Sequence, residues 1–214
     1  MRSISTKIKC VLLIVIISFT IEAYAQNSEV DYQTWTDVTL TYFFSQKLSL
    51  GGDAGLRGII SSKDWNLFYI RPTINYTVSP RFRFSGGIGS FNTFNNTLSN
   101  TYEIRPFQDA HISWPNIGWL DFYHRFRFEQ RFFFYQNLEN DFNIRGRYLF
   151  RVRTIDFKLF SKKKSFYLKG MWEVFVPIGK SATELFVNNQ RFYAAIGHRS
   201  SDRLRFFYTL KLPE

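Results

Sequence analysis

The sequence predicts an all-β protein: an antiparallel transmembrane β-barrel of about ten strands, with a range of about eight to twelve, after a cleaved signal peptide. Three observations predict it. An apolar leader opens the chain, aromatic residues make up 20% of it, and apolar residues alternate with charged ones along most of its length. Strands of such barrels alternate in this way because one face meets lipid and the other meets the lumen.

The first 25 residues have the features of an export signal. A basic segment with Arg2, Lys7 and Lys9 precedes the apolar run 11–21. This run is shorter than the ~20 residues of a membrane-spanning helix. The small residues of Ala23-Tyr24-Ala25 then favour cleavage before Gln26. We therefore expect a signal peptide at residues 1–25 and a β-barrel at residues 26–214.

The position of the one cysteine and the net charge limit which anchors, metal sites and binding partners we expect. Cys10 is the only cysteine and precedes the apolar run, so we expect neither a lipid anchor nor a disulfide, thiolate or cysteine metal ligand. The leader carries three basic residues and the acidic Glu22, so its removal lowers the formal charge from +11 to +9. An exported protein rarely meets nucleic acid, so the basic charge favours anionic lipid surfaces or internal salt bridges.

Ten segments alternate with a period of two residues. They span residues 33–45, 47–58, 65–78, 81–91, 99–114, 119–134, 142–159, 165–176, 190–199 and 203–212. We expect even-numbered apolar residues to face lipid, among them Val38, Leu40, Phe126, Phe128, Ile144, Phe150, Leu168 and Leu204. The odd-numbered charges should face inward, among them Arg105, Arg127, Glu129, Arg147 and Glu173.

Four local features qualify this pattern. The apolar parity changes after Arg153, which predicts a β-bulge near Thr154 or the end of the membrane segment. Pro72 and Pro106 each forfeit a ladder hydrogen bond, so we expect a bulge or the strand's rim at both. The glycines of the 86–89 segment (GGIG) lie inside a strand, where they relieve crowding in a curved sheet rather than bind phosphate.

The inward charges also predict a register for segments five and six. One register places Arg105 opposite Glu129, with Glu103 opposite Arg131 and Asp109 opposite Arg125. All three are opposite-charge pairs, which stabilise adjacent strands. This register leaves a three-residue loop at 116–118, with glycine at the position that favours a left-handed backbone.

No catalytic set is recognisable in the sequence. His111 shares the inward face with Asp109 and Ser113. Residues two apart on one strand lie ~7 Å apart, too far for direct proton relay, so we interpret these three as lumen lining. His124 lies on the lipid side by parity, and the lysine run 162–164 is typical of a solvated turn. We expect no enzymatic activity, no cofactor and no metal site.

Four stretches carry a family resemblance: QTWTDVTLTY (33–42), RPTINYTVSP (71–80), EIRPFQ (103–108) and HRFRFEQRF (124–132). They resemble the domain-of-unknown-function 2490 family, and the resemblance covers nearly the whole mature chain. It implies an exported outer-membrane β-barrel of Gram-negative bacteria and no established activity. The expected partners are outer-membrane lipid and lipopolysaccharide and, in addition, a protein of the same membrane, with no nucleic acid. The carboxyl end resembles a family member that lacks a final hairpin.

The remaining signal is a dense inward charge cluster. Its members are Glu103, Arg105, Asp109, Arg125, Arg127, Glu129, Arg131, Arg145, Arg147, Arg151 and Arg153. Barrels of about eight strands have filled interiors, whereas about 16 or more leave a channel. The leading hypothesis is therefore a small, non-enzymatic structural or accessory protein whose basic lumen is plugged by salt bridges. The alternatives are a narrow anion-selective pore and a lipid-modifying outer-membrane enzyme built around His124 or His111.

Overall fold

The computed structural model describes residues 33–59, 65–95, 100–136, 138–158, 165–178, 190–199 and 205–211. The expected signal peptide, the lysine run 162–164 and Leu204 lie outside the described residues. Residues 33–214 form one compact unit. Within the described ranges, no helix is long and apolar enough to span a membrane.

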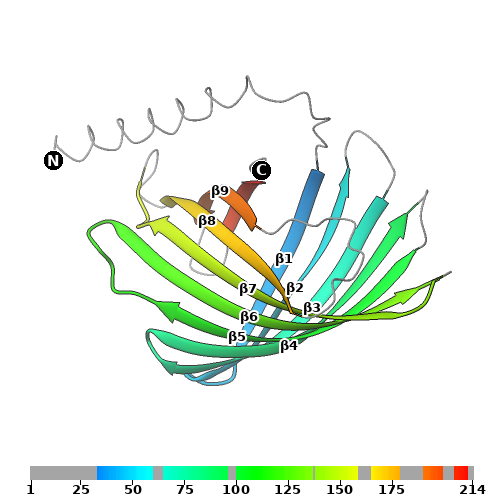
Figure 1. Cartoon of the computed structure of the whole chain (residues 1–214). Helices are drawn as coiled ribbons and strands as arrows, with labels where there is room; N and C mark the ends of the chain where they lie inside the picture. Colours follow the sequence, from blue (N-terminus) through cyan, green and yellow to red (C-terminus); the bar gives the residue numbers. More distant parts are fainter. Residues whose placement is uncertain are drawn as a thin grey trace. The chain divides into compact units, whose positions relative to one another are not determined.

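Ten antiparallel strands form one sheet in chain order, curved into a half-barrel (Figure 1). They are β1 (Gln33–Phe43), β2 (Leu48–Ile59), β3 (Trp65–Ser79), β4 (Phe82–Asn95), β5 (Thr101–Ser113), β6 (Leu120–Tyr135), β7 (Asp141–Thr154), β8 (Ser165–Ile178), β9 (Gln190–Arg199) and β10 (Arg205–Lys211). The predicted all-β antiparallel fold is confirmed. Every predicted segment has its strand, although β7 ends at Thr154 rather than at residue 159.

The sheet has two open edges. Its ladders run from β1 to β10, and among the described strands no ladder joins these two. Residues 36–43 of β1 are exposed at both parities, as are residues 206–209 of β10. The edge strands therefore lack the one-sided burial that the central strands show.

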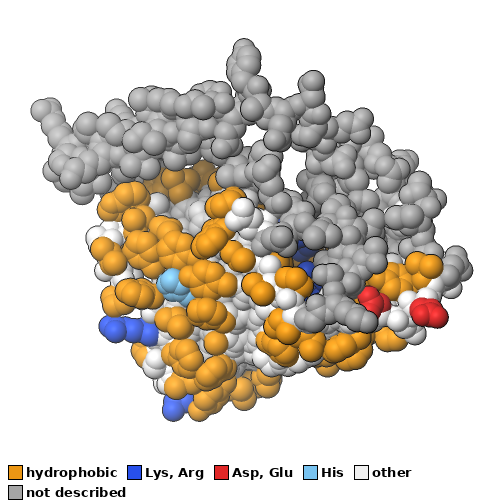
Figure 2. Space-filling view, in the orientation of Figure 1, with side chains coloured by type: hydrophobic (Ala, Val, Ile, Leu, Met, Phe, Trp, Pro, Cys, Tyr) orange, Lys and Arg blue, Asp and Glu red, His pale blue; other side chains and the backbone are white. Residues whose placement is uncertain are grey.

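The central strands bury one face and expose the other, as the alternation predicts. Odd-numbered residues pair with odd-numbered residues in the long ladders, for example Asp109 with Arg127 and Arg127 with Arg147. One face of the sheet therefore carries all odd positions. On the even face Leu40 is 73% exposed and Phe126 is 49% exposed, whereas Glu129 on the odd face is fully buried. Hydrophobic side chains cover most of the described surface visible in Figure 2.

Aromatic rings also lie on the buried face, which the sequence pattern did not predict. Tyr69, Phe91, Phe107, Phe133, Tyr167 and Phe175 are all buried. Glycines on neighbouring strands make room for some of them. A Cβ added to Gly197 would lie 2.0 Å from the Tyr167 ring, and one added to Gly87 would lie 2.7 Å from the Phe107 ring. The glycines inside β4 therefore relieve crowding, as expected.

The predicted register between β5 and β6 is wrong: one strand is shifted by two residues relative to the other. Glu129 lies opposite Phe107 instead of Arg105, and Asp109 lies opposite Arg127 instead of Arg125. The turn explains the shift. Ile117 and Leu120 exchange two backbone hydrogen bonds around a two-residue turn. Three residues lie between this pair and Ser113 on β5, whereas two lie between it and Tyr123 on β6, so one extra residue on the β5 side shifts the register. Gly118 does take the expected left-handed backbone, with φ of 62°.

The parity change after Arg153 is a β-bulge, as predicted. Arg153 pairs with Lys169 and Phe157 pairs with Phe166, so the chain carries one extra residue between these pairs, where β7 ends at Thr154. The expectation for the two prolines is wrong. Pro72 and Pro106 each pair normally on one side, and on the other side the ladder is interrupted without a change of register. The missing N–H donor of each proline therefore interrupts the ladder locally and does not rearrange the sheet.

Candidate functional site

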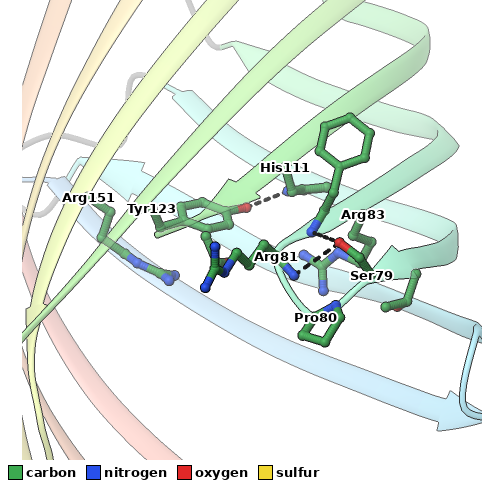
Figure 3. A pocket seen from close by; sticks show the side chains of 10 residues that line it. Ser79, Pro80, Arg81, Arg83, His111, Tyr123 and Arg151 are labelled. Carbon is green, nitrogen blue, oxygen red and sulfur yellow. Dashed lines mark hydrogen bonds between the residues drawn. The ribbon is translucent and has the colours of Figure 1, made fainter. Parts of the chain in front are cut away.

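A pocket of about 360 Å³ opens on the odd-numbered face where β3 turns into β4 (Figure 3). Its lining comes from the β3–β4 turn, β5, β6 and β7. The lining residues are Thr77, Ser79, Pro80, Arg81, Phe82, Arg83, His111, Ser113, Tyr123 and Arg151. Three of these are arginines and none is acidic, so the pocket carries excess positive charge.

His111 lies at the inner wall of this pocket in a chain of hydrogen bonds. Its Nδ1 contacts the Tyr123 hydroxyl, and its Nε2 lies 2.8 Å from Ser85 Oγ. Ser85 in turn donates to Asn75 Oδ1 at 2.7 Å. Because the Ser85 hydroxyl donates its proton to Asn75 Oδ1, His111 donates from Nε2 to Ser85 Oγ and accepts from the Tyr123 hydroxyl at Nδ1. His111 then has no lone pair for the serine proton, which a nucleophile–base pair requires.

The two residues that the sequence grouped with His111, Asp109 and Ser113, are only partly brought together with it. Asp109 Oδ2 lies 3.7 Å from His111 Nε2, although both oxygens of Asp109 are occupied by Arg127. Ser113 lines the pocket, but the serine that hydrogen-bonds His111 is Ser85. The cross-strand pairing of β4 and β5 brings Ser85 there, because Ser85 lies opposite Asp109. His124, on the even face as predicted, contacts the Tyr148 hydroxyl at 2.8 Å.

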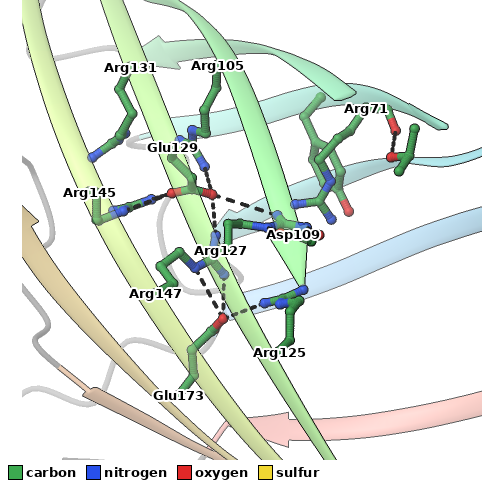
Figure 4. Close-up of polar contacts among 12 residues, drawn as sticks. Arg71, Arg105, Asp109, Arg125, Arg127, Glu129, Arg131, Arg145, Arg147 and Glu173 are labelled. Atoms are coloured by element: carbon green, nitrogen blue, oxygen red, sulfur yellow. Dashed lines mark hydrogen bonds and ion pairs between the residues drawn. The ribbon is translucent and has the colours of Figure 1, made fainter. Parts of the chain in front are cut away.

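Deeper on the same face, a network of ion pairs surrounds Glu129 (Figure 4). Arg145 and Arg147 on β7 each lie 2.8 Å from the Glu129 carboxylate. Two further arginines, Arg127 at 3.7 Å and Arg105 at 3.9 Å, complete a ring of positive charge around it. A fully buried carboxylate requires such compensation, because an unpaired buried charge is strongly destabilising.

Three more carboxylates extend this network. Glu173 on β8 holds Arg125 and Arg147, both at 2.7 Å. Asp109 binds Arg127 through two parallel hydrogen bonds of 2.6 and 2.7 Å. Glu103 lies 2.7 Å from both Arg105 and Arg131. We call this connected set the central charge network: Glu103, Asp109, Glu129, Glu173, Arg105, Arg125, Arg127, Arg131, Arg145 and Arg147.

The network contains every member of the predicted cluster except two. Arg153 pairs instead with Asp121 and Asp156, and Arg151 stacks on the ring of Tyr123. Glu173 belongs to the network although the sequence cluster omitted it. Its odd residue number, on the strand next to β7, was the feature of the sequence that could have placed it in the cluster. Six arginines against four carboxylates leave the central charge network net basic.

Buried rings form the floor beneath these arginines. The guanidinium carbon of Arg105 lies 4.0 Å from the centre of the Phe91 ring, and that of Arg127 lies 4.2 Å from the Phe107 ring. The Phe175 ring lies within cation–π range of Arg145 and Arg147. A guanidinium held between a ring and a carboxylate has both its flat face and its edge satisfied. The arrangement therefore favours a rigid interior.

A smaller polar cluster lies toward β1. Asp53 on β2 holds Arg71 of β3 at 2.5 Å, and the Tyr69 hydroxyl contacts Asp53 and Asp37. The sequence pattern did not predict a role for these residues. Within the described part of the chain, no group of three or more His, Cys, Asp or Glu side chains is placed to hold a metal ion.

The chain matches one family, whose description is "Protein of unknown function (DUF2490)", over residues 32–209. It belongs to the DUF2490 family. The match spans all ten strands apart from the end of β10, so the resemblance predicted from the four sequence stretches is confirmed. Among curated proteins, none matches the chain. Membership of DUF2490 assigns no activity, so the activity has to be argued from the site.

Proposed function

We propose that this DUF2490 protein is a small, non-enzymatic outer-membrane β-barrel, a structural or accessory component with a basic lumen plugged by salt bridges. One observation carries the proposal: the sheet exposes apolar side chains on one face and buries charges on the other. Val38, Leu40, Leu56, Ile74 and Ile88 are all more than half exposed. A continuous apolar surface of this kind is rare on proteins that live in water.

Lipid is the environment that suits this surface. In a barrel the apolar face meets the hydrocarbon, and the polar face is shielded inside. An unpaired sheet edge is costly in a bilayer, so the proposal includes pairing of β1 with β10 in the membrane. The leader at residues 1–25 supports export, and outer-membrane lipid and lipopolysaccharide are the proposed partners of the apolar face.

The central charge network supports the plugged lumen. Glu129 is fully buried, Glu173 is 3% exposed and Arg127 is 7% exposed, so this part of the interior has little room for water. About ten strands also lie near the small end of the barrel series, where side chains fill the interior. A narrow anion-selective pore is the second candidate, because the network is net basic and the pocket beside it has no acidic lining residue.

Planar-bilayer recording separates the two. The mature protein is inserted into a neutral phospholipid bilayer, and current is recorded in potassium chloride gradients. A plugged lumen predicts no steady conductance above that of the lipid alone. Steady currents whose reversal potential shows chloride selectivity would overturn the plug and establish the pore.

A further inference from the structure

The pocket at the β3–β4 turn differs from the central charge network in its charge balance. In the network each arginine contacts a carboxylate. In the pocket Arg81, Arg83 and Arg151 form no ion pair with any described residue, and the lining contains no Asp or Glu. The network arginines are therefore paired with carboxylates, whereas the three pocket arginines have no carboxylate partner among the described residues; Arg151 is half-buried and Arg81 and Arg83 are exposed.

Arg151 is the best-positioned of these three. Its guanidinium carbon lies 4.1 Å from the centre of the Tyr123 ring, which fixes the plane of the group. Its Nε is buried and has no hydrogen-bond partner among the described atoms. A buried donor without a partner is costly, because it has lost water and gained nothing in return. The rest of this guanidinium forms no ion pair with a described residue, so its other nitrogens are the donors that a ligand with acceptor oxygens would meet.

The surrounding groups supply further donors. Arg83 is exposed at the rim, and Arg81 follows the Ser79-Pro80 turn whose hydroxyl accepts the Arg81 and Phe82 backbone N–H groups. The Ser113 and Thr77 hydroxyls also line the space. Figure 3 shows the labelled Arg81, Arg83 and Arg151 with His111 among the side chains that line the pocket. Converging donors without acceptors of matching charge are suited to an anion.

We propose that this pocket binds a phosphate-bearing ligand. Arginine forks match phosphate oxygens through paired hydrogen bonds, and three guanidinium groups can compensate a group that carries more than one negative charge. The volume of about 360 Å³ exceeds what a bare anion needs, so part of the attached molecule fits inside. The phosphate belongs either to a lipid headgroup at the membrane rim or to a small soluble phosphate ester.

The proposal does not depend on whether the lumen is plugged, although its headgroup alternative rests on the proposed membrane location, so each can fail alone. The folded mature protein in a maltoside detergent is titrated with glucose 1-phosphate in a calorimeter. Parallel titrations use Arg83→Gln, Arg151→Gln and, as a charge-matched control, Lys158→Gln. Lys158 is exposed and does not line the pocket. Heat-modifiability on gels confirms that each variant is folded, and Arg83 at the exposed rim guards against a loss of fold at Arg151.

A second set of titrations uses nanodiscs of phosphatidylcholine with and without phosphatidic acid, read by the phosphatidic acid retained in native mass spectra. Saturable binding of glucose 1-phosphate identifies a soluble ester. Retention of phosphatidic acid alone identifies a headgroup. In either case Arg83→Gln and Arg151→Gln should weaken binding about tenfold or more, the loss of one charged hydrogen bond, and Lys158→Gln should leave it within about twofold. Absence of binding to both probes, or equal affinity in all variants, overturns the proposal.

Discussion

Glu129 on β6 and Arg147 on β7 form an ion pair of 2.8 Å although they are not opposite one another in the ladder. The residue opposite Arg147 is Arg127, and the residue opposite Glu129 is Arg145. The carboxylate therefore lies diagonally between arginines and offsets a like-charge pair on adjacent strands. Glu129 is fully buried, and its charge is shared between Arg145 and Arg147.

Replacing Glu129 with glutamine should destabilise the protein strongly. The amide keeps the shape and removes the charge, which takes away the buried carboxylate that Arg145 and Arg147 share. Breaking a buried ion pair on one side costs about 3–5 kcal/mol. The measurement is the free energy of unfolding in urea in lipid vesicles. Glu139→Gln, in the exposed β6–β7 connection, is the matched control and should change it by less than about 0.5 kcal/mol. Equal stability of both variants would contradict the role given to Glu129.

A positive charge on the exposed apolar face should also destabilise the protein in lipid. Phe126 is 49% exposed on the even face, next to Tyr148 across the ladder. Phe126→Arg should cost about 2–4 kcal/mol, the cost of arginine near the bilayer midplane. Phe126→Leu controls for the lost ring. If the arginine variant unfolds from vesicles at the same urea concentration as the leucine variant, Phe126 does not face hydrocarbon.

Two glycines on neighbouring strands should respond in opposite directions to alanine. A Cβ at Gly197 would lie 2.0 Å from the ring of Tyr167, whereas one at Gly170 meets nothing within 4 Å. Gly197→Ala should therefore destabilise by about 1–3 kcal/mol through overpacking. Gly170→Ala should stabilise by about 0.5–1 kcal/mol, because alanine has less freedom to lose in a strand. Unfolding free energies compare the two, and a neutral Gly197→Ala would mean that Tyr167 does not pack there.

Closure of the sheet between β1 and β10 can be tested with disulfides. Phe207→Cys on β10 is combined in turn with Thr39→Cys, Thr41→Cys or Phe43→Cys on β1, in the mature chain from Gln26 onward, whose sequence has no native cysteine. All four positions are odd-numbered and share one face when the edges pair. At least one combination should form an intramolecular disulfide in membranes, because bridged cysteines need Cα atoms within about 7 Å.

The matched control combines Phe207→Cys with Leu40→Cys, which lies on the opposite face of β1. It should not form the bond. Disulfides that appear solely between two copies of the chain, on non-reducing gels, would show that β1 pairs with another protein and would contradict closure.

The period of two was enough to predict all ten strands and the faces of the central ones, because burial on one side leaves its mark on every second residue. Register was harder. Glu103 forms an ion pair with Arg131 and Arg105 lies near Glu129, although the observed register places neither pair directly opposite. An arginine side chain is long enough to reach a diagonal neighbour, two residues along the adjacent strand. Charge pairing therefore could not distinguish two registers that differ by two residues.

Other features depend on contacts that alternation does not record. The rings of Phe107 and Phe175 are on the odd-numbered face and stack on arginines. The alternation pattern predicted that rings face lipid, so it did not predict these two. Ser85 reaches His111 through the ladder between β4 and β5, a contact between residues that are distant in sequence. The pocket depends on which arginines lack a carboxylate, and this became visible once the pairing of the others was known.

The central claim, that the even-numbered face meets lipid, is tested most directly at Trp172. It lies on that face of β8 and is 37% exposed. A variant with Trp35, Trp65, Trp114 and Trp119 replaced by phenylalanine leaves Trp172 as the one tryptophan reporter. Its fluorescence is measured in vesicles of phospholipids brominated along the acyl chains and, separately, with iodide in the buffer. We predict strong quenching by the brominated chains and little by iodide; quenching by iodide without an effect of the brominated lipid would contradict the account.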